Sequence, residues 1–412
     1  MKFYKVGGCV RDRLLNLPLK DVDWVVVGAE AQQLIDAGYK AVGKDFPVFL
    51  HPKTHEEYAL ARTERKTAPG YSGFQFHAAA DVTLEEDLKR RDLTINAIAE
   101  SEHGEIIDPY NGLADLKQRV LRHVSEAFAE DPVRILRLAR FAARFSPLGF
   151  RIASETRVLM RSMVDNGEVD ALVPERVWQE TQRALGEAAP REYFEALREC
   201  GALARLFPEL DNLYGVPQPK EHHPEIDTGL HTMLVLEQAC KLSNDSKVRF
   251  AALLHDLGKA TTPQEEWPKH IAHEARGVPL VEALCQRYKV HRDYRELAQL
   301  VAEYHLHFHR AAELTDKTFL KTLKALDAFR RPERFDAFLL ACEADSRGRP
   351  GYEDRKLLQP AIFHAAFAAA NAIDAQQMVQ QGLHGKQIAE ALDRQRVAAI
   401  HAARAKLNGS VT

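Results

Sequence analysis

Cysteine is scarce in this chain and follows no recognisable pattern. The five cysteines among 412 residues are odd in number and widely separated, and no two of them form a CxxC pair. A disulfide framework and a zinc knuckle both need cysteines at set spacings, so neither is expected here. A reducing compartment fits these cysteines best, and we expect a cytoplasmic protein.

Long apolar runs and a strong excess of one charge are also missing. No apolar stretch approaches the ~18 residues that a helix needs to cross a bilayer, so we expect neither membrane anchoring nor export. The formal net charge is −3, which argues against a uniformly basic nucleic-acid binder. Any site for a polyanion must therefore be local.

Strand-like segments are present, and they cluster near the start of the chain. They are FYKV, DWVVVG, FPVFL, EEYALA and GEIIDP, separated by glycine, proline and polar turns. From residue 111 onward nearly every segment shows helical spacing. The stretch 216–229 holds three prolines and no apolar periodicity, so it is predicted to be a linker or lid. These patterns predict an α/β head, with a small mixed sheet and helices, followed by an all-α body.

Two aspartates stand two residues apart at the start of an apolar strand. Successive side chains of a strand alternate between its faces, so Asp21 and Asp23 should project to the same side. Two carboxylates this close repel unless they are protonated or share cations, and hard divalent ions such as Mg²⁺ prefer oxygen ligands. For an isolated pair, the ordinary alternative is a solvated strand end with two exposed acids.

A glycine turn upstream favours the metal interpretation. Gly7 and Gly8 follow an apolar strand and precede the helical spacing of VRDRLL, where backbone amides can bind phosphate and Arg11 adds positive charge. Glycine turn, arginine and paired acids in this order resemble the nucleotidyltransferase superfamily. In that superfamily two acids hold two Mg²⁺ ions, which activate a hydroxyl and neutralise a triphosphate.

Four further segments narrow the resemblance. They are, in chain order, LKRRDLTINAIA, NGLADL, EDPVRILRLARFAARF and PERVWQE. Together they resemble the signature motifs of class II CCA-adding enzymes and bacterial poly(A) polymerases. The resemblance to bacterial CCA-adding enzymes implies template-independent addition of C, C and A to the 3′ end of tRNA from CTP and ATP. A poly(A) polymerase is the nearest alternative, although its relatives usually carry strongly basic tails and this tail is near neutral.

The resemblance also implies roles for residues in these motifs. Arg91 can reach the triphosphate, and Asp92 can accept a hydrogen bond from a ribose 2′-hydroxyl. In the family, Asp131 and Arg134 contact the Watson-Crick edge of the incoming base. Cytosine and adenine both place an exocyclic amino donor beside a ring-nitrogen acceptor, so a carboxylate and a guanidinium complement both bases. Guanine and uracil present the reverse pattern and are rejected.

The segment 130–145 carries a basic stripe. Four arginines are spaced three, three and four apart and share one helix face: Arg134, Arg137, Arg140 and Arg144. We expect this face to lie opposite an apolar one: Ile135, Leu138, Phe141 and Phe145. Arg137 and Arg140 are therefore candidates for further nucleotide contacts. A merely solvated basic face is the ordinary alternative.

Three other features of the first half follow from the resemblance. Glu57 is a candidate third acid near the metals. The polar segment 64–74 is predicted to be a mobile loop that helps the switch from adding C to adding A. PERVWQE, residues 174–180, is predicted to pack beneath the base-reading helix and to position it.

The second half of the chain is rich in histidine. FAALLHDLGKA places His255 and Asp256 after an apolar helical stretch, with His231 upstream and Asp345 downstream. This order resembles the HD phosphohydrolase superfamily, whose helical bundle brings these four ligands onto one divalent metal. The resemblance implies 2′,3′-cyclic phosphodiesterase, 2′-nucleotidase and phosphatase activities, with Lys259 stabilising the scissile phosphate.

The mixture of ligands indicates which metal the HD site should hold. Neutral imidazoles together with carboxylates favour a borderline transition metal, such as Ni²⁺, Mn²⁺ or Co²⁺, over Mg²⁺, and among these we expect Ni²⁺ first. A metal-bound water is then able to attack a phosphate ester. His273 and His305 are candidates for a second ion, although the histidines at 305, 307 and 309 can equally be helix-surface residues.

These motifs divide the chain into four predicted domains. Residues 1–115 form the nucleotidyltransferase head, 116–220 the nucleobase-reading and neck region, 221–350 the HD domain, and 351–412 a helical tail that contacts tRNA. The expected partners are tRNA, CTP and ATP, with no membrane, and the expected state is a monomer or weak homodimer. Two alternatives of other classes are a hydrolase with an inactive head and a noncatalytic RNA-binding module.

Overall fold

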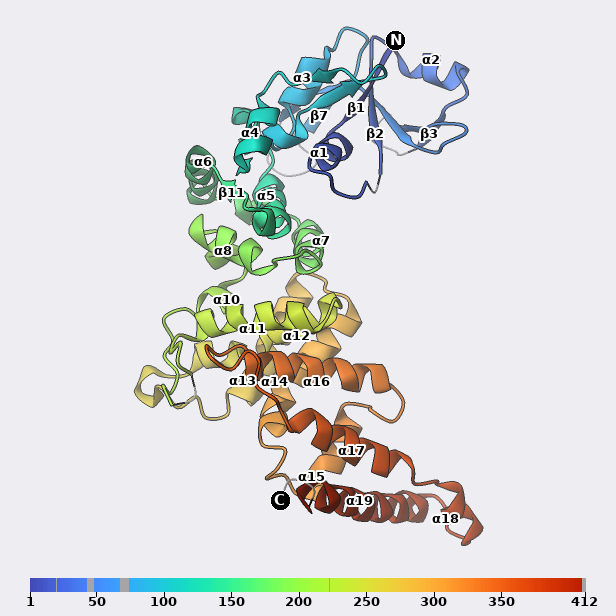
Figure 1. The fold of residues 1–412 in the computed structure, drawn as a ribbon, viewed down its shortest axis with the longest axis vertical. Coiled ribbons are helices and arrows are strands. Elements are labelled where there is room, and N and C mark those ends of the chain that lie inside the picture. Colours follow the sequence, from blue (N-terminus) through green and yellow to red (C-terminus); the bar gives the residue numbers. More distant parts are fainter. Residues whose placement is uncertain (20, 43–47, 67–73, 222, 410–412) are drawn as a thin grey trace. The chain divides into compact units, whose positions relative to one another are not determined.

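The structure, a computed structural model, divides into two compact units, Met1–Leu206 and Phe207–Thr412 (Figure 1). It describes five stretches of the chain: 1–19, 21–42, 48–66, 74–221 and 223–409. All five cysteines are free thiols. In the described part of the chain, no helix is both long enough and apolar enough to span a bilayer.

The first unit opens on a seven-stranded mixed sheet of order β3-β4-β5-β2-β1-β8-β9. Its strands are β1 (Lys2–Val6), β2 (Asp23–Val27), β3 (Lys40–Val42), β4 (Val48–Leu50), β5 (Glu57–Leu60), β8 (Ala99–Ser101) and β9 (Ile106–Ile107). Only β2 and β5 pair in parallel. The mixed sheet expected from the sequence is confirmed, and each of the five strand-like segments contains a strand.

Both faces of this sheet are buried, and the alternation along β2 decides which way its first aspartate points. Val25 packs into a cluster with Leu88 and Ala97, whereas Val26 packs into a second cluster on the other face. Asp23 stands two residues before Val25 and therefore shares its face. That face is covered by α3 (Leu84–Lys89) and the 3₁₀ turn η2 (Thr94–Asn96), and the RRDLTINA motif begins directly after α3 and contains η2.

The loop predicted over 64–74 is in part a β-hairpin. Strands β6 (Thr63–Lys66) and β7 (Phe74–His77) pair antiparallel, so the polar composition concealed two short strands. Residues 67–73 lie outside the described residues, and the predicted part in the switch from C to A stays a prediction.

The rest of the first unit is mostly helical. Its helices are α1 (Gly8–Leu14), α2 (Ala31–Asp36), α4 (Gly112–Gln118), α5 (Val133–Phe145), α6 (Ser154–Asp165), α7 (Pro174–Leu185), α8 (Arg191–Glu199) and α9 (Ala202–Leu206). A two-stranded parallel pair joins β10 (Val120–Leu121) to β11 (Arg151–Ile152). Helix α5 packs against both α7 and α8. It is therefore the buried centre of this region, and Leu136, Leu138 and Ala139 are fully buried.

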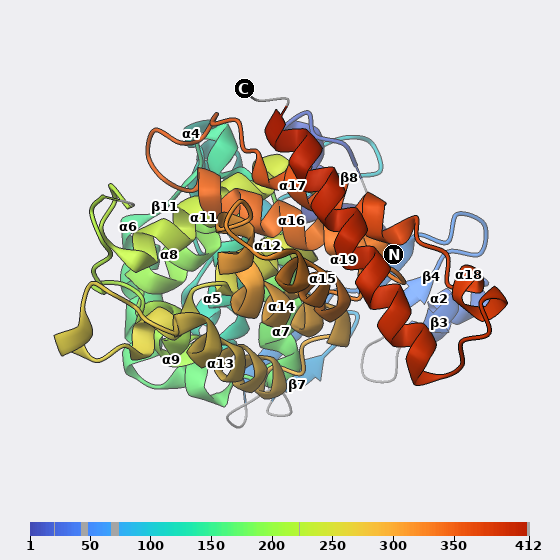
Figure 2. The ribbon, with the colours of Figure 1, turned by 90° about the horizontal axis from the view of Figure 1, so that it is seen from below.

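The second unit is all-α, as predicted. Its bundle contains α10 (Pro208–Asp211), α11 (Thr228–Leu242), α12 (Ser246–Leu254), α13 (His273–Arg287), α14 (Arg292–His309), α15 (Asp316–Ala325) and α16 (Pro332–Arg347). The tail adds α17 (Gln359–Asn371), α18 (Gln376–Gln380) and α19 (Lys386–Gly409), and α19 lies against α17 and α15 (Figure 2). Helices α11, α12, α14 and α16 pack on one another and form the centre of the bundle.

The proline-rich stretch 216–229 is not a free linker. Gln218 is buried, and its side chain accepts a hydrogen bond from Lys259 Nζ at 2.5 Å. The carbonyl of Pro217 is 2.8 Å from His270 Nε2. These polar contacts, which apolar periodicity cannot reveal, fasten the stretch to the second unit.

Gly258, in the 3₁₀ turn η6 (Leu257–Thr261), offers a sharp steric test of this packing. A Cβ at this position would lie 1.9 Å from the carbonyl oxygen of His273 and 2.7 Å from the amide nitrogen of Gly277. Because neither backbone atom can move without shifting α13, we expect Gly258→Ala to lower the free energy of unfolding by about 1–3 kcal/mol. Urea unfolding of the full chain measures the loss.

Gly277→Ala is the matched control for this change. Its Cβ would meet no described atom nearer than 3.4 Å. It also replaces a glycine inside a helix, so we expect no loss and a gain of up to about 1 kcal/mol. Equal stability of the two variants would contradict the close packing of η6 on α13.

Candidate functional site

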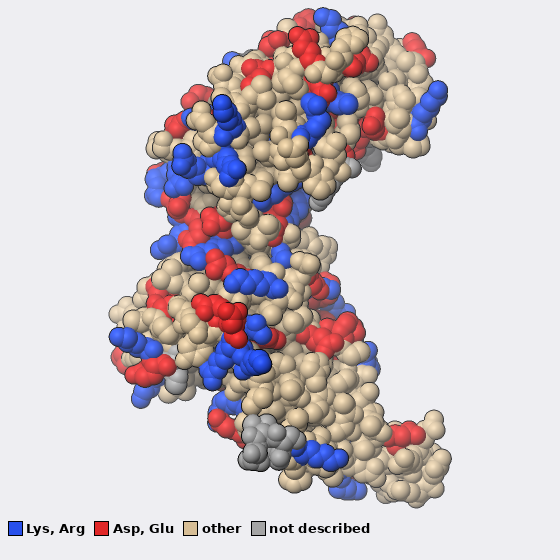
Figure 3. All heavy atoms as spheres, in the orientation of Figure 1, with Lys and Arg blue, Asp and Glu red and all other residues tan. Residues whose placement is uncertain are grey.

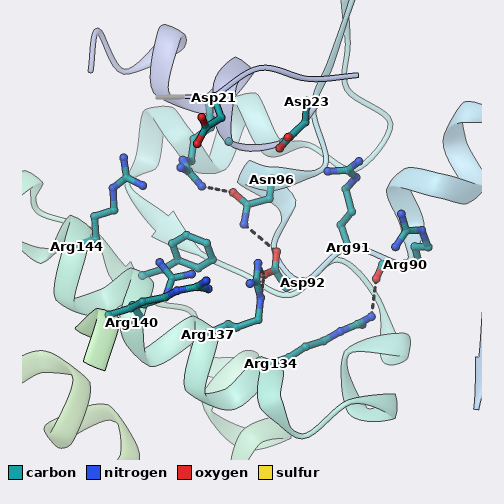
Figure 4. Close-up of a pocket in the computed structure, with 15 residues that line it drawn as sticks. Asp21, Asp23, Arg90, Arg91, Asp92, Asn96, Arg134, Arg137, Arg140 and Arg144 are labelled. Carbon is teal, nitrogen blue, oxygen red and sulfur yellow. Dashed lines mark hydrogen bonds and ion pairs between the residues drawn. The ribbon is translucent and has the colours of Figure 1, made fainter. Parts of the chain in front are cut away.

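A polar cavity of about 590 Å³ lies in the first unit, within the size range of small-molecule sites (Figure 4). Eight arginines line it: Arg11, Arg90, Arg91, Arg134, Arg137, Arg140, Arg144 and Arg183. The other lining residues that the structure describes are three aspartates, two glycines, Asn96 and Phe141. The residues predicted to bind nucleotide or metal in the head line this cavity, with the exceptions of Asp131 and the candidate third acid Glu57.

The two predicted metal ligands, Asp21 and Asp23, lie together at one end of the cavity (Figure 4). Partial burial raises the pKa of the Asp23 carboxyl, Arg91 lowers it, and the negative charge of Asp21 raises it further. Glu57, the candidate third acid, is the register partner of Asp23 on β5 and so points to the same face of the sheet. These oxygen donors are a set that fits a hard divalent cation.

The glycine turn lets an arginine approach the backbone. Gly7 has a φ of 71°, and a Cβ there would lie 2.7 Å from Arg91 Nη1. Gly8 then begins α1, which is only seven residues long. The positive charge of the cavity therefore comes mainly from arginine side chains, and the glycines make room for them.

Buried carboxylates hold the arginines in place. The ion pairs are Asp12 with Arg11 and Arg144, Asp87 with Arg90 and Arg91, Asp92 with Arg137, and Glu180 with Arg140. These four acids are at most 7% exposed as whole residues. The eight arginines still outnumber the three aspartates of the lining and the partners Asp12, Asp87 and Glu180 taken together, so a net positive charge remains that suits a polyanion such as a triphosphate.

Both carboxylate oxygens of Asp92 accept hydrogen bonds from neighbouring residues. Its Oδ1 accepts from the amide of Leu93 at 2.9 Å and from Asn96 Nδ2 at 2.8 Å, and its Oδ2 accepts two bonds from Arg137. Burial alone would raise the pKa of this carboxyl, but Arg137 and Asn96 outweigh burial and hold that pKa well below its usual value. A ribose hydroxyl can therefore bind Asp92 only by displacing one of these donors.

Asp131 and Arg134 are neighbours at the start of α5, where the Arg134 amide donates to the Asp131 carbonyl oxygen at 3.0 Å, and both side chains have other partners. Arg134 donates 2.7 Å hydrogen bonds to the carbonyl oxygens of Ala127 and Arg90. Both oxygens of Asp131 accept from Arg176, at 3.2 and 2.9 Å. Arg176 belongs to PERVWQE on α7, which packs against α5 as predicted.

The expected separation of basic and aromatic residues on α5 is wrong for Phe141. Its ring lines the cavity, 4.8 Å from the guanidinium of Arg140 and 5.8 Å from that of Arg137. At 100° per residue, Phe141 lies one turn after Arg137 and therefore on the same side of the helix. The ring provides an apolar wall against which the guanidinium groups pack.

The second unit brings the four predicted HD ligands together from three separate parts of the chain. His231 lies on α11, His255 and Asp256 lie between α12 and η6, and Asp345 lies on α16. His231 Nε2 is 3.1 Å from Asp345 Oδ1, and His255 Nε2 is 3.1 Å from Asp256 Oδ2 and 3.7 Å from Asp345 Oδ1. All four residues are at most 3% exposed.

The backbone fixes which imidazole nitrogen faces the centre of this cluster. Nδ1 of His255, His273 and His305 lies 2.7 to 3.1 Å from a backbone carbonyl oxygen, which favours the proton on Nδ1 and leaves the lone pair on Nε2. His255 Nε2 and Asp256 Oδ1 make no hydrogen bond with any described residue, although both are buried. Buried atoms of this kind need a partner, and a divalent cation satisfies them together.

His273 and His305 lie beside the same cluster. Their Nε2 atoms are 3.1 Å apart, and they lie 3.3 and 3.7 Å from Asp256 Oδ1. Burial lowers the pKa of His305 to about 3, so this imidazole is neutral and able to bind a metal at neutral pH. Two lone pairs that face each other at this distance repel unless a cation lies between them.

The other two histidines of α14 face different neighbours. His307 points to Thr322 on α15, whereas His309 Nε2 lies 2.5 Å from Asp345 Oδ2. Lys259 Nζ is 2.6 Å from Asp256 Oδ2 and lines a small cavity of about 180 Å³ beside the cluster. His305 and His309 therefore face the HD cluster, whereas His307, which is partly buried, faces α15.

Three families match successive parts of the sequence. The Poly A polymerase head domain matches residues 3–122, the Probable RNA and SrmB- binding site of polymerase A matches residues 149–214, and the HD domain matches residues 228–332. A Multifunctional CCA protein of Thioalkalivibrio sulfidiphilus (strain HL-EbGR7) is 64% identical over 409 residues, which cover 99% of this chain and 100% of that protein. This chain belongs to the multifunctional CCA protein family.

A second relative agrees with membership of this family, and two solved structures have the same fold. The Multifunctional CCA protein of Pseudomonas aeruginosa (strain PAO1) is 57% identical over 402 residues, 98% of each chain. An apo CCA-adding enzyme aligns with a TM-score of 0.67 at 21% identity, covering 100% of this chain and 92% of that one. A Thermotoga maritima CCA-adding enzyme complexed with tRNA aligns with a TM-score of 0.63 at 21% identity, covering 98% and 91%. These structures share the fold.

Asn96 is a site residue that the sequence interpretation missed. It accepts a hydrogen bond from Arg11 Nη1 at 2.5 Å and donates one to Asp92 at 2.8 Å, so it joins α1 to the RRDLTINA motif. The sequence could have indicated Asn96 by its place inside that motif, four residues after Asp92. The buried acids Asp12 and Asp87 were missed as well, because their arginine partners are recognisable only in the folded chain.

Asn96→Ala tests the bridge between Arg11 and Asp92. Leaving a buried guanidinium nitrogen and a carboxylate oxygen without this partner costs about 1–3 kcal/mol. We therefore expect a lower unfolding temperature and weaker CTP binding, measured by thermal unfolding and titration calorimetry. Asn166→Ala, at the exposed end of α6, should change neither quantity. Unaltered CTP binding by the Asn96 variant would show that the bridge does not shape the cavity.

Proposed function

We propose that this chain adds C, C and A to the 3′ end of tRNA from CTP and ATP, and that its HD cluster hydrolyses phosphate esters. One observation carries the first activity: Asp21 and Asp23 face an arginine-lined cavity in a chain that is 64% identical to a multifunctional CCA protein. Relatives solved with CTP and with ATP, and one complexed with tRNA, support these three partners. The HD family match supports the second activity.

The head residues divide the work of nucleotide addition. Asp21 and Asp23 supply the oxygen ligands that suit Mg²⁺. When bound, Mg²⁺ contributes charge that neutralises a triphosphate and activates a 3′-hydroxyl. Arg91 and Arg11, which lie closest to the glycine turn, bind and orient the phosphate oxygens. Arg137 and Arg140 extend this positive surface along α5.

We assign selection of the incoming base to Asp131 and Arg134. Both side chains are engaged elsewhere in the structure, Asp131 by Arg176 and Arg134 by two carbonyl groups. Reading a base therefore requires Arg176 to release the carboxylate, so that Asp131 accepts from the exocyclic amino group while Arg134 donates to the ring nitrogen. Asp92 selects ribose by exchanging Asn96 or Arg137 for the 2′-hydroxyl.

The HD residues supply the second activity. His231, His255, Asp256 and Asp345 form a mixed nitrogen and oxygen set that suits a transition metal, and Ni²⁺ is the ion we propose. Such an ion supplies a nucleophilic water at neutral pH. Lys259 lies against Asp256 and lines the small cavity, where its ammonium group can neutralise a phosphate oxygen. Asp256, His273 and His305 form the site of a second ion.

The remaining assignments extend this proposal to the whole chain. We also propose the four-part division at residues 115, 220 and 350, with the tail in contact with tRNA. On the face seen in Figure 3, the tail helices show mostly uncharged residues, which suits contact by shape more than strong phosphate binding. A monomer or weak homodimer in the cytoplasm completes the proposal.

Single substitutions, one in each site, should separate the two activities. Asp23→Asn removes one metal-binding charge, worth several kcal/mol, and should lower addition of labelled CTP and ATP to truncated tRNA by at least about a hundredfold. Hydrolysis of a cyclic phosphate should persist in this variant. His255→Ala should do the reverse. Asp36→Asn, on the exposed side of α2, is the matched control and should keep both activities.

Two results of this assay would contradict the proposal. A chain that extends tRNA with ATP but barely uses CTP would be a poly(A) polymerase. Loss of both activities in one properly folded variant would show that the two sites do not act separately.

The second HD ion is tested by counting bound metal. After loading the full chain with Ni²⁺ and removing excess ion, elemental analysis should find two ions per wild-type chain and one per chain of His305→Ala. His364→Ala, an exposed histidine of α17, is the control and should keep two. One ion in all three proteins would contradict a second site.

A further inference from the structure

A second cavity adjoins the HD cluster, along the segment that joins α16 to α17. Its volume is about 370 Å³, and it shares His309 and Arg349 with the small cavity that opens on Asp256 and Asp345. The two cavities therefore meet at these two side chains. We name the larger one the α16–α17 pocket, and its other lining residues used below are Tyr352, Arg355, Lys356 and Ile362.

The α16–α17 pocket carries positive charge. Arg349, Arg355 and Lys356 line it, and the lining residues that the structure describes include no Asp or Glu. Arg349 Nε is buried and has no hydrogen-bond partner among the described residues, while its Nη2 lies 3.8 Å from Asp345 Oδ1. An anion in the pocket would provide the missing acceptor and offset the three positive charges.

The pocket also has an aromatic wall. Tyr352 is partly buried, and the guanidinium of Arg355 lies 5.3 Å from the centre of its ring. Ile362, on α17, adds an apolar side chain. An aromatic ring beside arginine and lysine is the combination that holds single-stranded nucleotides, because the ring stacks on a base while the cations bind phosphate.

We propose that the α16–α17 pocket binds the nucleoside part of the HD substrate. This inference rests on the proposed phosphohydrolase activity. The base stacks on Tyr352, and a further phosphate of the same nucleotide is held by Arg355 and Lys356. His309, whose Nε2 is 2.5 Å from Asp345 Oδ2, and Arg349 stand between the two cavities. The reacting phosphate lies on the Asp345 side of this pair, and the nucleoside lies on the other side.

The arrangement selects a class of substrate. A nucleotide with a 2′,3′-cyclic phosphate and a 5′-phosphate gives the HD cluster a reacting phosphorus and gives the pocket a base and a second anion. Hydrolysis adds one water and breaks one phosphorus–oxygen bond, which leaves a phosphate monoester on the ribose. p-Nitrophenyl phosphate offers the reacting phosphate alone. The HD centre therefore prefers the phosphorylated 3′ end of an RNA to a simple phosphate ester.

The test compares these two substrates in the full chain loaded with Ni²⁺. Hydrolysis of adenosine 2′,3′-cyclic phosphate 5′-phosphate and of p-nitrophenyl phosphate is to be measured for three proteins: wild type, Tyr352→Leu and Arg355→Gln. We expect each variant to raise KM for the cyclic nucleotide about tenfold, the usual scale for one stacked base or one charged contact. Hydrolysis of p-nitrophenyl phosphate should stay within about twofold of wild type.

Arg292→Gln is the matched control, because this arginine is exposed at the start of α14 and does not line the pocket. It should leave both substrates unchanged. An unchanged KM for the cyclic nucleotide in both pocket variants would overturn the inference, as would an equal loss on both substrates, which would indicate a structural role. Hydrolysis of neither substrate by wild type would instead overturn the proposed phosphohydrolase activity.

Discussion

In both sites of this chain, the fold holds groups close together that repel one another: arginine side chains in the head and imidazole lone pairs in the HD cluster. In the head, eight arginines line one cavity and are held by buried carboxylates such as Asp12 and Asp87. In the HD cluster, two imidazole nitrogens face each other at 3.1 Å beside Asp256. Both arrangements favour a ligand of the opposite charge, and most of the surrounding structure serves to keep these groups from moving apart.

The two sites differ in the donors they offer, which explains how one chain keeps two chemistries distinct. Asp21 and Asp23 provide oxygen beside a surface that attracts triphosphate. The HD cluster provides imidazole nitrogen whose tautomer is favoured by backbone carbonyl groups, as at His255. Hard ions suit the first set and borderline ions suit the second, so the two proposed metal sites favour different ions.

The sequence was sufficient for features that local pattern or motif order determines. These include the five strand segments, the paired aspartates and the order of the HD residues. It was not sufficient for contacts between distant residues, such as Arg144 with Asp12 across 132 positions or Asn96 with Arg11 across 85. The hairpin β6–β7 was concealed by glycine and proline between its strands. The α16–α17 pocket was missed because its cations are scattered in a segment without periodicity.

The central claim is that the arginine-lined cavity is the nucleotide site of the head. A crystal structure of the chain with CTP and Mg²⁺ tests it most directly. The account predicts that the triphosphate lies among Arg11 and Arg91, with metal bound to oxygens of Asp21 and Asp23. A nucleotide bound elsewhere, with this cavity free of both triphosphate and metal, would contradict the account.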